Sequence, residues 1–259
     1  MTAVFTKMAV LLRDDASIYY TVHGAGPAVL LSHGFSFSHN MWDGQLEALS
    51  QHHKLICWDM RGHGQSDGGD DPAGYSVEET VSDMAALLDH CGVDEAVIGG
   101  LSLGGYMSLA FQMTHRTRTR ALMLFDTGPG FKKNEARDSW NATANARADK
   151  FESEGLAALA TSSSAARDAN HASIQGLAHA ARGMLAQKDA DIIFSLPDIT
   201  APTLVLVGSE DKPFFAATDY MAAKIPNSTK VVIDGAGHSA NIDQPAAFNN
   251  AVRAFLASL

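Results

Sequence analysis

Ser102 stands at the centre of a Gly-Leu-Ser-Leu-Gly pentapeptide at residues 100–104. An apolar run at residues 96–98 precedes the pentapeptide, and a helical pattern at residues 103–113 follows. A serine on a sharp turn from strand to helix projects its hydroxyl clear of the sheet, and the flanking glycines permit the tight backbone and the close contact of strand with helix. The spacing therefore makes Ser102 a candidate nucleophile.

A serine hydroxyl is a weak nucleophile at neutral pH, so it needs a neighbouring base. Of the eleven histidines, His238 is distinguished because it follows the apolar run 231–233 through the loop 234–237, at the carboxyl end of an expected strand. A histidine on such a loop can reach across to Ser102. His238 is therefore the candidate base, although its position alone fits a surface loop histidine equally well.

A histidine base needs a carboxylate that holds its tautomer and stabilises the imidazolium. Asp211 comes just after the apolar run 203–207, at the carboxyl end of another expected strand. The adjacent Glu210 is a rival, but neighbouring side chains diverge and only one of the two can face the histidine. Asp126, which follows the run 121–125, is a second rival whose alternative role is in a turn.

Acyl transfer develops negative charge on an oxygen, and backbone N–H groups must point at it. We assign these donors to the amides of Phe35, in a glycine-containing turn after an apolar strand, and Leu103, at the start of a helix. A helix N-terminus attracts negative charge. His33 precedes Ser102 in the chain, so a structural hydrogen bond in its own turn is favoured over a role as the base.

Eight β-rich runs alternate with helical patterns, which predicts an α/β fold with a mostly parallel eight-stranded sheet and helices on both faces. The first two runs leave no room for a helix between them, so they should form an antiparallel hairpin at one edge. The later runs are apolar throughout, as expected of strands covered on both faces. The runs occupy residues 8–13, 18–22, 28–31, 55–58, 96–98, 121–125, 203–207 and 230–233.

Residues 131–195 interrupt this alternation, because they are Ala-rich and contain no convincing strand. We interpret them as a helical cap inserted into a core formed by residues 1–130 and 196–259, since insertions at the carboxyl end of a parallel sheet overhang the ligand site. The alternative is a pair of packing helices without a substrate role. Candidate pocket residues of the cap, which could equally form its own core, are Phe131, Trp140 and Met184.

The net charge of -10 argues against nucleic-acid binding, which needs clustered basic residues. No stretch approaches the roughly 18 to 20 apolar residues of a membrane span, and no secretory signal is evident. We therefore expect a cytoplasmic protein without a membrane partner, whose two cysteines, Cys57 and Cys91, are buried and reduced. No cofactor or metal is expected, because the adjacent pair His52 and His53 lacks a carboxylate at useful spacing. The sequence carries no signal of an oligomeric state.

Five segments together resemble the α/β-hydrolase superfamily, in order and in rough spacing. The resemblance covers nearly the whole chain and is weakest over the cap. The elbow and residues 41–43 are similar to small bacterial esterases and 3-oxoadipate enol-lactonases. The resemblance implies an α/β-hydrolase fold and a structural rather than catalytic place for His63 and Ser66. The five segments are residues 33–35, 59–66, 100–105, 208–211 and 237–238.

By this resemblance the chain is a serine hydrolase that cleaves a small-molecule carboxylic ester or lactone through an acyl-enzyme, with Ser102, His238 and Asp211 as its triad. Carbon-carbon bond hydrolases of the meta-cleavage-product type and cofactor-free perhydrolases or haloperoxidases share that triad, so they remain alternatives. A small-molecule receptor on the same fold is the non-enzymatic alternative. If the apolar side chains of the cap line the pocket, they suggest a small to medium uncharged ester. No basic residue near the motifs clearly marks a carboxylate-bearing substrate, which weakens the enol-lactonase alternative.

Overall fold

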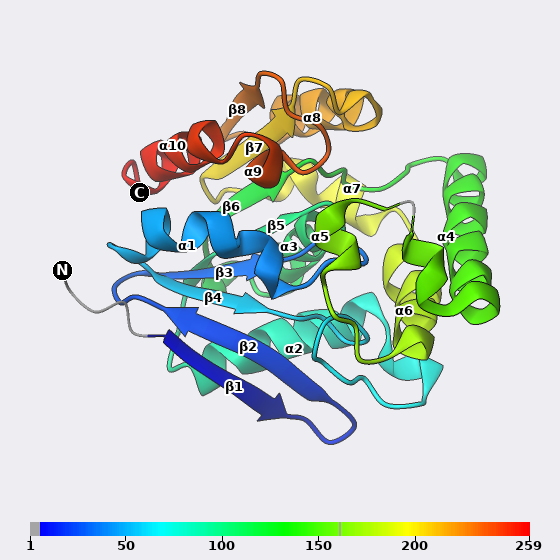
Figure 1. Cartoon of the computed structure of the whole chain (residues 1–259). Coiled ribbons are helices and arrows are strands. Elements are labelled where there is room, and N and C mark those ends of the chain that lie inside the picture. The colour runs from blue at the N-terminus through cyan, green and yellow to red at the C-terminus, as the bar shows by residue number, and fades with distance from the viewer. Residues whose placement is uncertain (1–5, 161) are drawn as a thin grey trace.

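The computed structural model describes residues 6–160 and 162–259. These residues form an eight-stranded sheet in the order β1-β2-β4-β3-β5-β6-β7-β8 (Figure 1). β1 pairs antiparallel with β2 and β2 with β4, whereas the remaining neighbours are parallel, so the predicted sheet and its edge hairpin are confirmed. The strands are β1 (Thr6–Leu12), β2 (Ser17–His23), β3 (Ala28–Ser32), β4 (Lys54–Trp58), β5 (Ala96–Leu101), β6 (Thr119–Phe125), β7 (Thr203–Gly208) and β8 (Ser228–Ile233).

Helices cover both faces of the sheet. Because successive side chains of a strand point to opposite faces, Ile98 of β5 joins one hydrophobic core and Val97 joins the other. The first core contains side chains of α2 (Val77–His90), α3 (Leu103–Thr114) and α8 (Lys212–Lys224). The second contains side chains of α1 (Asp43–Ser50), α9 (Ala240–Asp243) and α10 (Pro245–Leu256).

The strands differ in how completely they are covered. Every residue of β3, β5 and β7 is buried, as apolar runs in the middle of a parallel sheet predict. β8 departs from that prediction, because Lys230 is exposed and Val232 retains 43% of its surface. The strand lies at the edge of the sheet, where it has one neighbour and where helices cover only part of its surface.

A helical segment separates β6 from β7, and Figure 1 shows it beyond one end of the sheet. It contains no strand within its described residues, in agreement with the sequence pattern. Its limits at residues 131 and 195 stay a prediction. The helices are α4 (Asn134–Glu154), α5 (Ser164–Arg167), α6 (Ile174–Ala180), a π-helical turn (Ala181–Leu185) and α7 (Asp191–Ser195).

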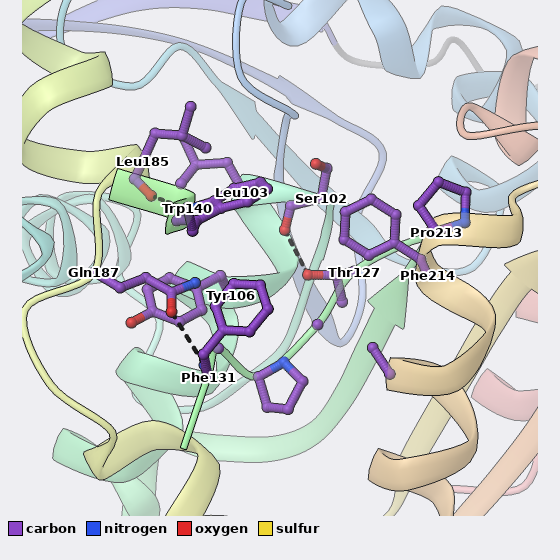
Figure 2. A pocket seen from close by; sticks show the side chains of 14 residues that line it. Ser102, Leu103, Tyr106, Thr127, Phe131, Trp140, Leu185, Gln187, Pro213 and Phe214 are labelled. Atoms are coloured by element: carbon purple, nitrogen blue, oxygen red, sulfur yellow. Dashed lines mark hydrogen bonds between the residues drawn. The ribbon is translucent and has the colours of Figure 1, made fainter. Parts of the chain in front are cut away.

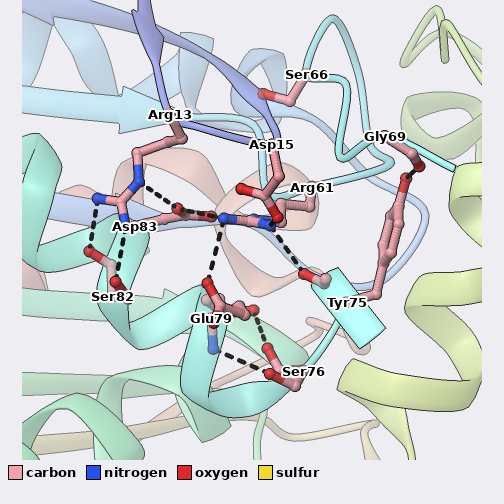
Figure 3. Close-up of polar contacts among 12 residues, drawn as sticks. Arg13, Asp15, Arg61, Ser66, Gly69, Tyr75, Ser76, Glu79, Ser82 and Asp83 are labelled. Atoms are coloured by element: carbon pink, nitrogen blue, oxygen red, sulfur yellow. Dashed lines mark hydrogen bonds and ion pairs between the residues drawn. The ribbon is translucent and has the colours of Figure 1, made fainter. Parts of the chain in front are cut away.

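A corner built on Arg61 joins the hairpin, the loop after β4 and α2 (Figure 3). Arg61 is buried, and its Nε and Nη2 donate to the two carboxylate oxygens of Asp83 at 2.7 and 3.0 Å. Its Nη1 donates to Asp15 at 2.7 Å. Burial alone would lower the pKa of Arg61, but the hydrogen bonds to Asp83 and Asp15 raise it above its usual value. This corner is therefore a charged cross-link between elements distant in sequence.

The helical segment contacts this corner through its backbone. A Cβ placed on Gly62, whose φ is +73°, would lie 2.4 Å from the carbonyl oxygen of Gly176 in α6. A Cβ on Gly183 would lie 1.8 Å from the carbonyl oxygen of Tyr75. Glycine at these positions lets the two parts of the chain touch directly.

Both cysteines are free, as expected, but only Cys57 is buried. Cys91 is half-buried, because it ends α2 rather than lying inside the sheet. Within residues 6–160 and 162–259, no helix is both long and apolar enough to span a membrane.

Candidate active site

Ser102 occupies the turn between β5 and α3 with φ 55° and ψ −115°. This backbone conformation is strained for a residue with a Cβ, at a cost of roughly 1–3 kcal/mol. Two hydrogen bonds hold the turn: the Ser102 amide donates to the Phe125 carbonyl at 2.9 Å, and Thr127 Oγ1 donates to the Ser102 carbonyl at 2.6 Å (Figure 2). The turn is thus fixed by the end of the neighbouring strand β6.

The two glycines of the pentapeptide are required by close backbone contacts. A Cβ on Gly100 would lie 2.4 Å from the Gly104 carbonyl carbon, and one on Gly104 would lie 2.2 Å from the Ser32 oxygen. The strand and helix therefore approach each other as closely as the motif predicts.

The loops after β7 and β8 bring Asp211 and His238 together. His238 Nδ1 lies 2.8 Å from Asp211 Oδ2. Because an ionised carboxylate only accepts hydrogen bonds, the proton is on Nδ1 and Nε2 is left as an acceptor. Asp211 retains 4% of its side-chain surface and His238 retains 37%. The Phe214 ring stacks on the imidazole with centroids 4.7 Å apart.

The rival carboxylates have other surroundings. Glu210 is exposed. Asp126 is buried, and it accepts hydrogen bonds from the amides of Gly208 at 2.8 Å and Ala240 at 3.4 Å. Burial raises the pKa of Asp126 to about 7. Asp126 thus connects the end of β7 to the helix that follows His238. Among the residues that the structure describes, no hydrogen bond joins Asp126 to the imidazole, which bonds to Asp211.

Within the part of the chain that the structure describes, the Ser102 hydroxyl forms no hydrogen bond with His238. The imidazole of His238 bonds to Asp211 instead. Catalytic hydrogen bonds are often long before substrate binds and shorten in the complex, so this geometry is compatible with proton transfer between the two groups.

The Phe35 and Leu103 amides donate to no acceptor within the part of the chain that the structure describes. The Leu103 amide lies at the N-terminus of α3, where helix N–H groups lack partners. His33, two residues before Phe35, uses both ring nitrogens: its Nε2 accepts from the Met60 amide at 2.9 Å, so its Nδ1 donates to the Gly34 carbonyl at 2.7 Å. Burial lowers the pKa of His33 to about 4, which keeps the ring neutral.

His63 and Ser66 belong to the structural corner. The Ser66 hydroxyl donates to the Asp59 carbonyl at 2.6 Å and accepts from the Tyr19 amide at 2.8 Å. His63 is fully buried and bonds to the Arg61 carbonyl at 3.0 Å. Burial lowers the pKa of His63 well below its usual value.

A cavity of 280 Å³ opens beside Ser102 and Leu103 (Figure 2). Phe131 and Trp140 line it, with ring centroids 5.9 Å apart, and Trp140 Nε1 donates to the Leu185 carbonyl at 2.8 Å. The structure does not place Met184 in this cavity: Met184 is fully buried in the core, and its neighbour Leu185 lines the cavity instead. Neighbouring residues of a helical turn face different directions, and composition could not show which one faces the cavity.

The cavity residues that the sequence did not predict include Tyr106, Thr127, Gln187 and Phe214. Tyr106 follows Ser102 by one helical turn, and Thr127 and Phe214 lie close after strand ends, so their positions carried a signal. The position of Gln187 in the sequence gave no such signal. Its side-chain oxygen accepts from the Phe131 amide at 3.1 Å and so shapes the cavity wall.

No group of three or more His, Cys, Asp or Glu side chains that could hold a metal occurs among the described residues.

The sheet order, the helices on both faces and the serine elbow define an α/β-hydrolase fold. The model of the Alpha/beta hydrolase family matches residues 29–251. The chain is 31% identical over 253 residues to 3-oxoadipate enol-lactonase 1 of Acinetobacter baylyi, with 90% of each chain covered. This protein therefore belongs to the alpha/beta hydrolase family.

Two solved structures are similar over almost their whole length. A thermophilic esterase from Thermogutta terrifontis shares 29% identity with a TM-score of 0.82, covering 97% of this chain and 98% of that one. The enol-lactonase from Burkholderia xenovorans LB400 shares 26% identity with a TM-score of 0.78, covering 96% of this chain and 100% of that one.

Proposed function

We propose that this hydrolase cleaves a carboxylic ester or lactone through an acyl-enzyme on Ser102. The observation that carries the proposal is the His238–Asp211 pair at 2.8 Å. Its two loops follow β7 and β8 at the same edge of the parallel strands as the strained serine elbow after β5. The similarity to an enol-lactonase at 31% identity and to an esterase at 29% supports ester and lactone chemistry.

In this mechanism Ser102 Oγ attacks the substrate carbonyl while His238 Nε2 takes its proton. Asp211 holds the Nδ1 proton and stabilises the imidazolium. The Phe35 and Leu103 amides bind the oxyanion, and each such donor contributes roughly 2.7–4 kcal/mol in comparable enzymes. His238 then protonates the leaving oxygen. Water, activated by the same base, attacks the acyl-enzyme, which releases the acid and restores the Ser102 hydroxyl.

The apolar cavity beside Ser102 fits an uncharged part of the substrate. Its volume of 280 Å³ is at the small end of ligand sites. The rings of Phe131 and Trp140 and the side chain of Leu185 would contact alkyl or aryl groups of that part.

The test is a panel of p-nitrophenyl esters of increasing acyl length, run beside lactones and an aromatic ring-cleavage product. We expect sustained turnover of esters or lactones, and a loss in kcat on the order of 10⁴ or more in Ser102→Ala with an unchanged circular dichroism spectrum. Asp211→Asn should lower kcat by about 10⁴, whereas Asp126→Asn should cost far less.

Near wild-type turnover in Ser102→Ala would contradict the proposal. Turnover of the ring-cleavage product alone would favour a carbon-carbon bond hydrolase. A burst that stalls after one equivalent of product would favour a receptor.

A further inference from the structure

A second cavity, of 420 Å³, borders the candidate base His238. Its wall includes Phe35, whose amide is a candidate oxyanion donor, and two cations of α4, Arg147 and Lys150. None of its described lining residues is acidic. The cavity therefore presents positive charge beside the proposed catalytic residues.

Arg147 has no ion-pair partner among the described residues. Its guanidinium lies over the Phe35 ring, 6.0 Å from the centroid. The nearby acid Glu152 of the same helix pairs instead with Arg182, at 2.8 Å. Lys150 has only a loose contact with Glu154, at 3.9 Å. Both cavity cations are thus available to an incoming anion.

Arg147 lacks an ion-pair partner among the described residues although the chain has 29 acidic residues against 19 lysines and arginines. Arg147 is exposed along part of its length, yet the surrounding protein desolvates it enough to lower the pKa of its guanidinium. A charge held in such a place without a counter-ion binds a carboxylate favourably, because the planar guanidinium matches the two carboxylate oxygens.

We propose that Arg147, assisted by Lys150, binds a carboxylate of the substrate. The inference rests on the proposed ester or lactone hydrolysis and adds the substrate class: a molecule with an uncharged part for the Ser102 cavity and a carboxylate for the His238 cavity. It replaces the sequence-based expectation of an uncharged ester. That expectation came from the apolar residues of the cap and from the lack of a clear basic residue near the motifs, whereas Arg147 lies far from the motifs in sequence, on α4.

The test compares esters that differ only in charge. One pair is p-nitrophenyl hydrogen glutarate and its methyl ester, which vary the acyl side; the other is 4-carboxyphenyl butyrate and its methyl ester, which vary the alcohol side. The wild-type enzyme should prefer the anionic member of at least one pair. Arg147→Gln should lower kcat/KM for that member on the order of tenfold or more, mainly through KM, and leave the neutral member unchanged.

Arg253→Gln is the matched control, because it removes the same charge from an exposed position on α10 outside both cavities. Arg253→Gln should leave kcat/KM unchanged for both the anionic and the neutral esters. No anionic preference in either pair would overturn the proposal. An equal loss for the anionic and neutral members in Arg147→Gln would also overturn it, since Arg147 would then act only by positioning Phe35.

Binding separates this proposal from the proposed hydrolysis. Calorimetric titration of Ser102→Ala with glutarate should show binding that weakens with salt and that is lost when Arg147→Gln is added. If the wild-type enzyme hydrolyses none of the esters, the proposed function fails, while the glutarate titration still decides the anion site. The proposed carboxylate site would be overturned if glutarate did not bind, or if it bound equally well with and without Arg147→Gln.

Discussion

Ser102 shows the conflict between stability and chemistry at one residue. Its φ of 55° and ψ of −115° suit glycine, yet the proposed reaction requires a hydroxyl. The hydrogen bonds from Thr127 and to Phe125 hold the residue in this conformation. The strain is thus offset by the neighbouring strand end.

We therefore predict that Ser102→Gly is inactive but more stable than Ser102→Ala by about 1 kcal/mol, since relief of roughly 1–3 kcal/mol of strain exceeds the extra chain entropy of glycine. Urea unfolding followed by tryptophan fluorescence measures the difference. Both variants lack the hydroxyl, so the comparison isolates the backbone. Equal midpoints and slopes would show that the strain at the elbow is no larger than the chain entropy that glycine costs.

Asp126 gives a prediction of pH dependence. Its pKa is raised from 3.8 to about 7 by burial, so its neutral form is the one that the fold favours. The contribution of this group to stability is present below its unfolded pKa and is lost as the pH rises through about 7. The stability of the wild-type protein relative to Asp126→Asn should therefore fall as the pH rises from 3.8 to about 7.

Urea unfolding of both proteins across that interval is the measurement. Asp234→Asn removes a negative charge from an exposed loop position and serves as the control. A stability difference between wild type and Asp126→Asn that stays constant with pH would mean that Asp126 titrates as it does in the unfolded chain.

At the scale of elements, the Arg61 corner connects the hairpin, the β4 loop and α2 (Figure 3). The backbone of the helical segment contacts this corner at Gly62. Two acidic partners of Arg61 differ in burial: the Asp83 side chain is fully buried, whereas Glu79 is 42% exposed and 3.4 Å away. The two carboxylates should therefore differ sharply in what they contribute to stability.

We predict that Asp83→Asn destabilises the fold by about 3–5 kcal/mol, because it leaves a buried guanidinium without its main counter-charge. For a chain of this size the melting temperature should fall by about 10 °C. Glu79→Gln should cost about 1 kcal/mol or less. Scanning calorimetry of the two variants is the test. Equal falls in melting temperature would show that burial does not decide how much each carboxylate contributes to stability.

At the scale of the whole molecule, burial is uneven across the sheet. All residues of β3 and β5 are buried, whereas Met8 and Leu12 of β1 retain 69% and 78% of their surface and Val232 of β8 retains 43%. The middle of the sheet is covered by two cores, whereas its edge strands are covered only in part.

Hydrogen exchange should follow this distribution. Amides of β3 and β5 should exchange only through global unfolding, while those of β1 and β8 should exchange orders of magnitude faster through local opening. Mass spectrometry of peptides from exchanged protein measures both. Uniform protection across all strands would contradict a fold whose edges open independently of its centre.

Much of the fold was predictable from local patterns. The eight β-rich runs correspond to the eight strands, and the strand ends differ by a few residues because end residues such as Thr119 and Ser228 are polar. The exposure of β8 was not predictable, since an apolar run cannot reveal whether its strand lies in the middle of a sheet or at the edge.

The sequence by itself determined the elbow at Ser102, the loops that carry Asp211 and His238, and the helical segment between β6 and β7, because these depend on turn chemistry and on periodicity along a short stretch. Only the tertiary structure decided that Asp211 rather than Asp126 pairs with His238, and that Arg147 lies over Phe35. Those contacts join elements distant in the chain, and the packing of whole elements, rather than local residue preference, sets which side chains meet.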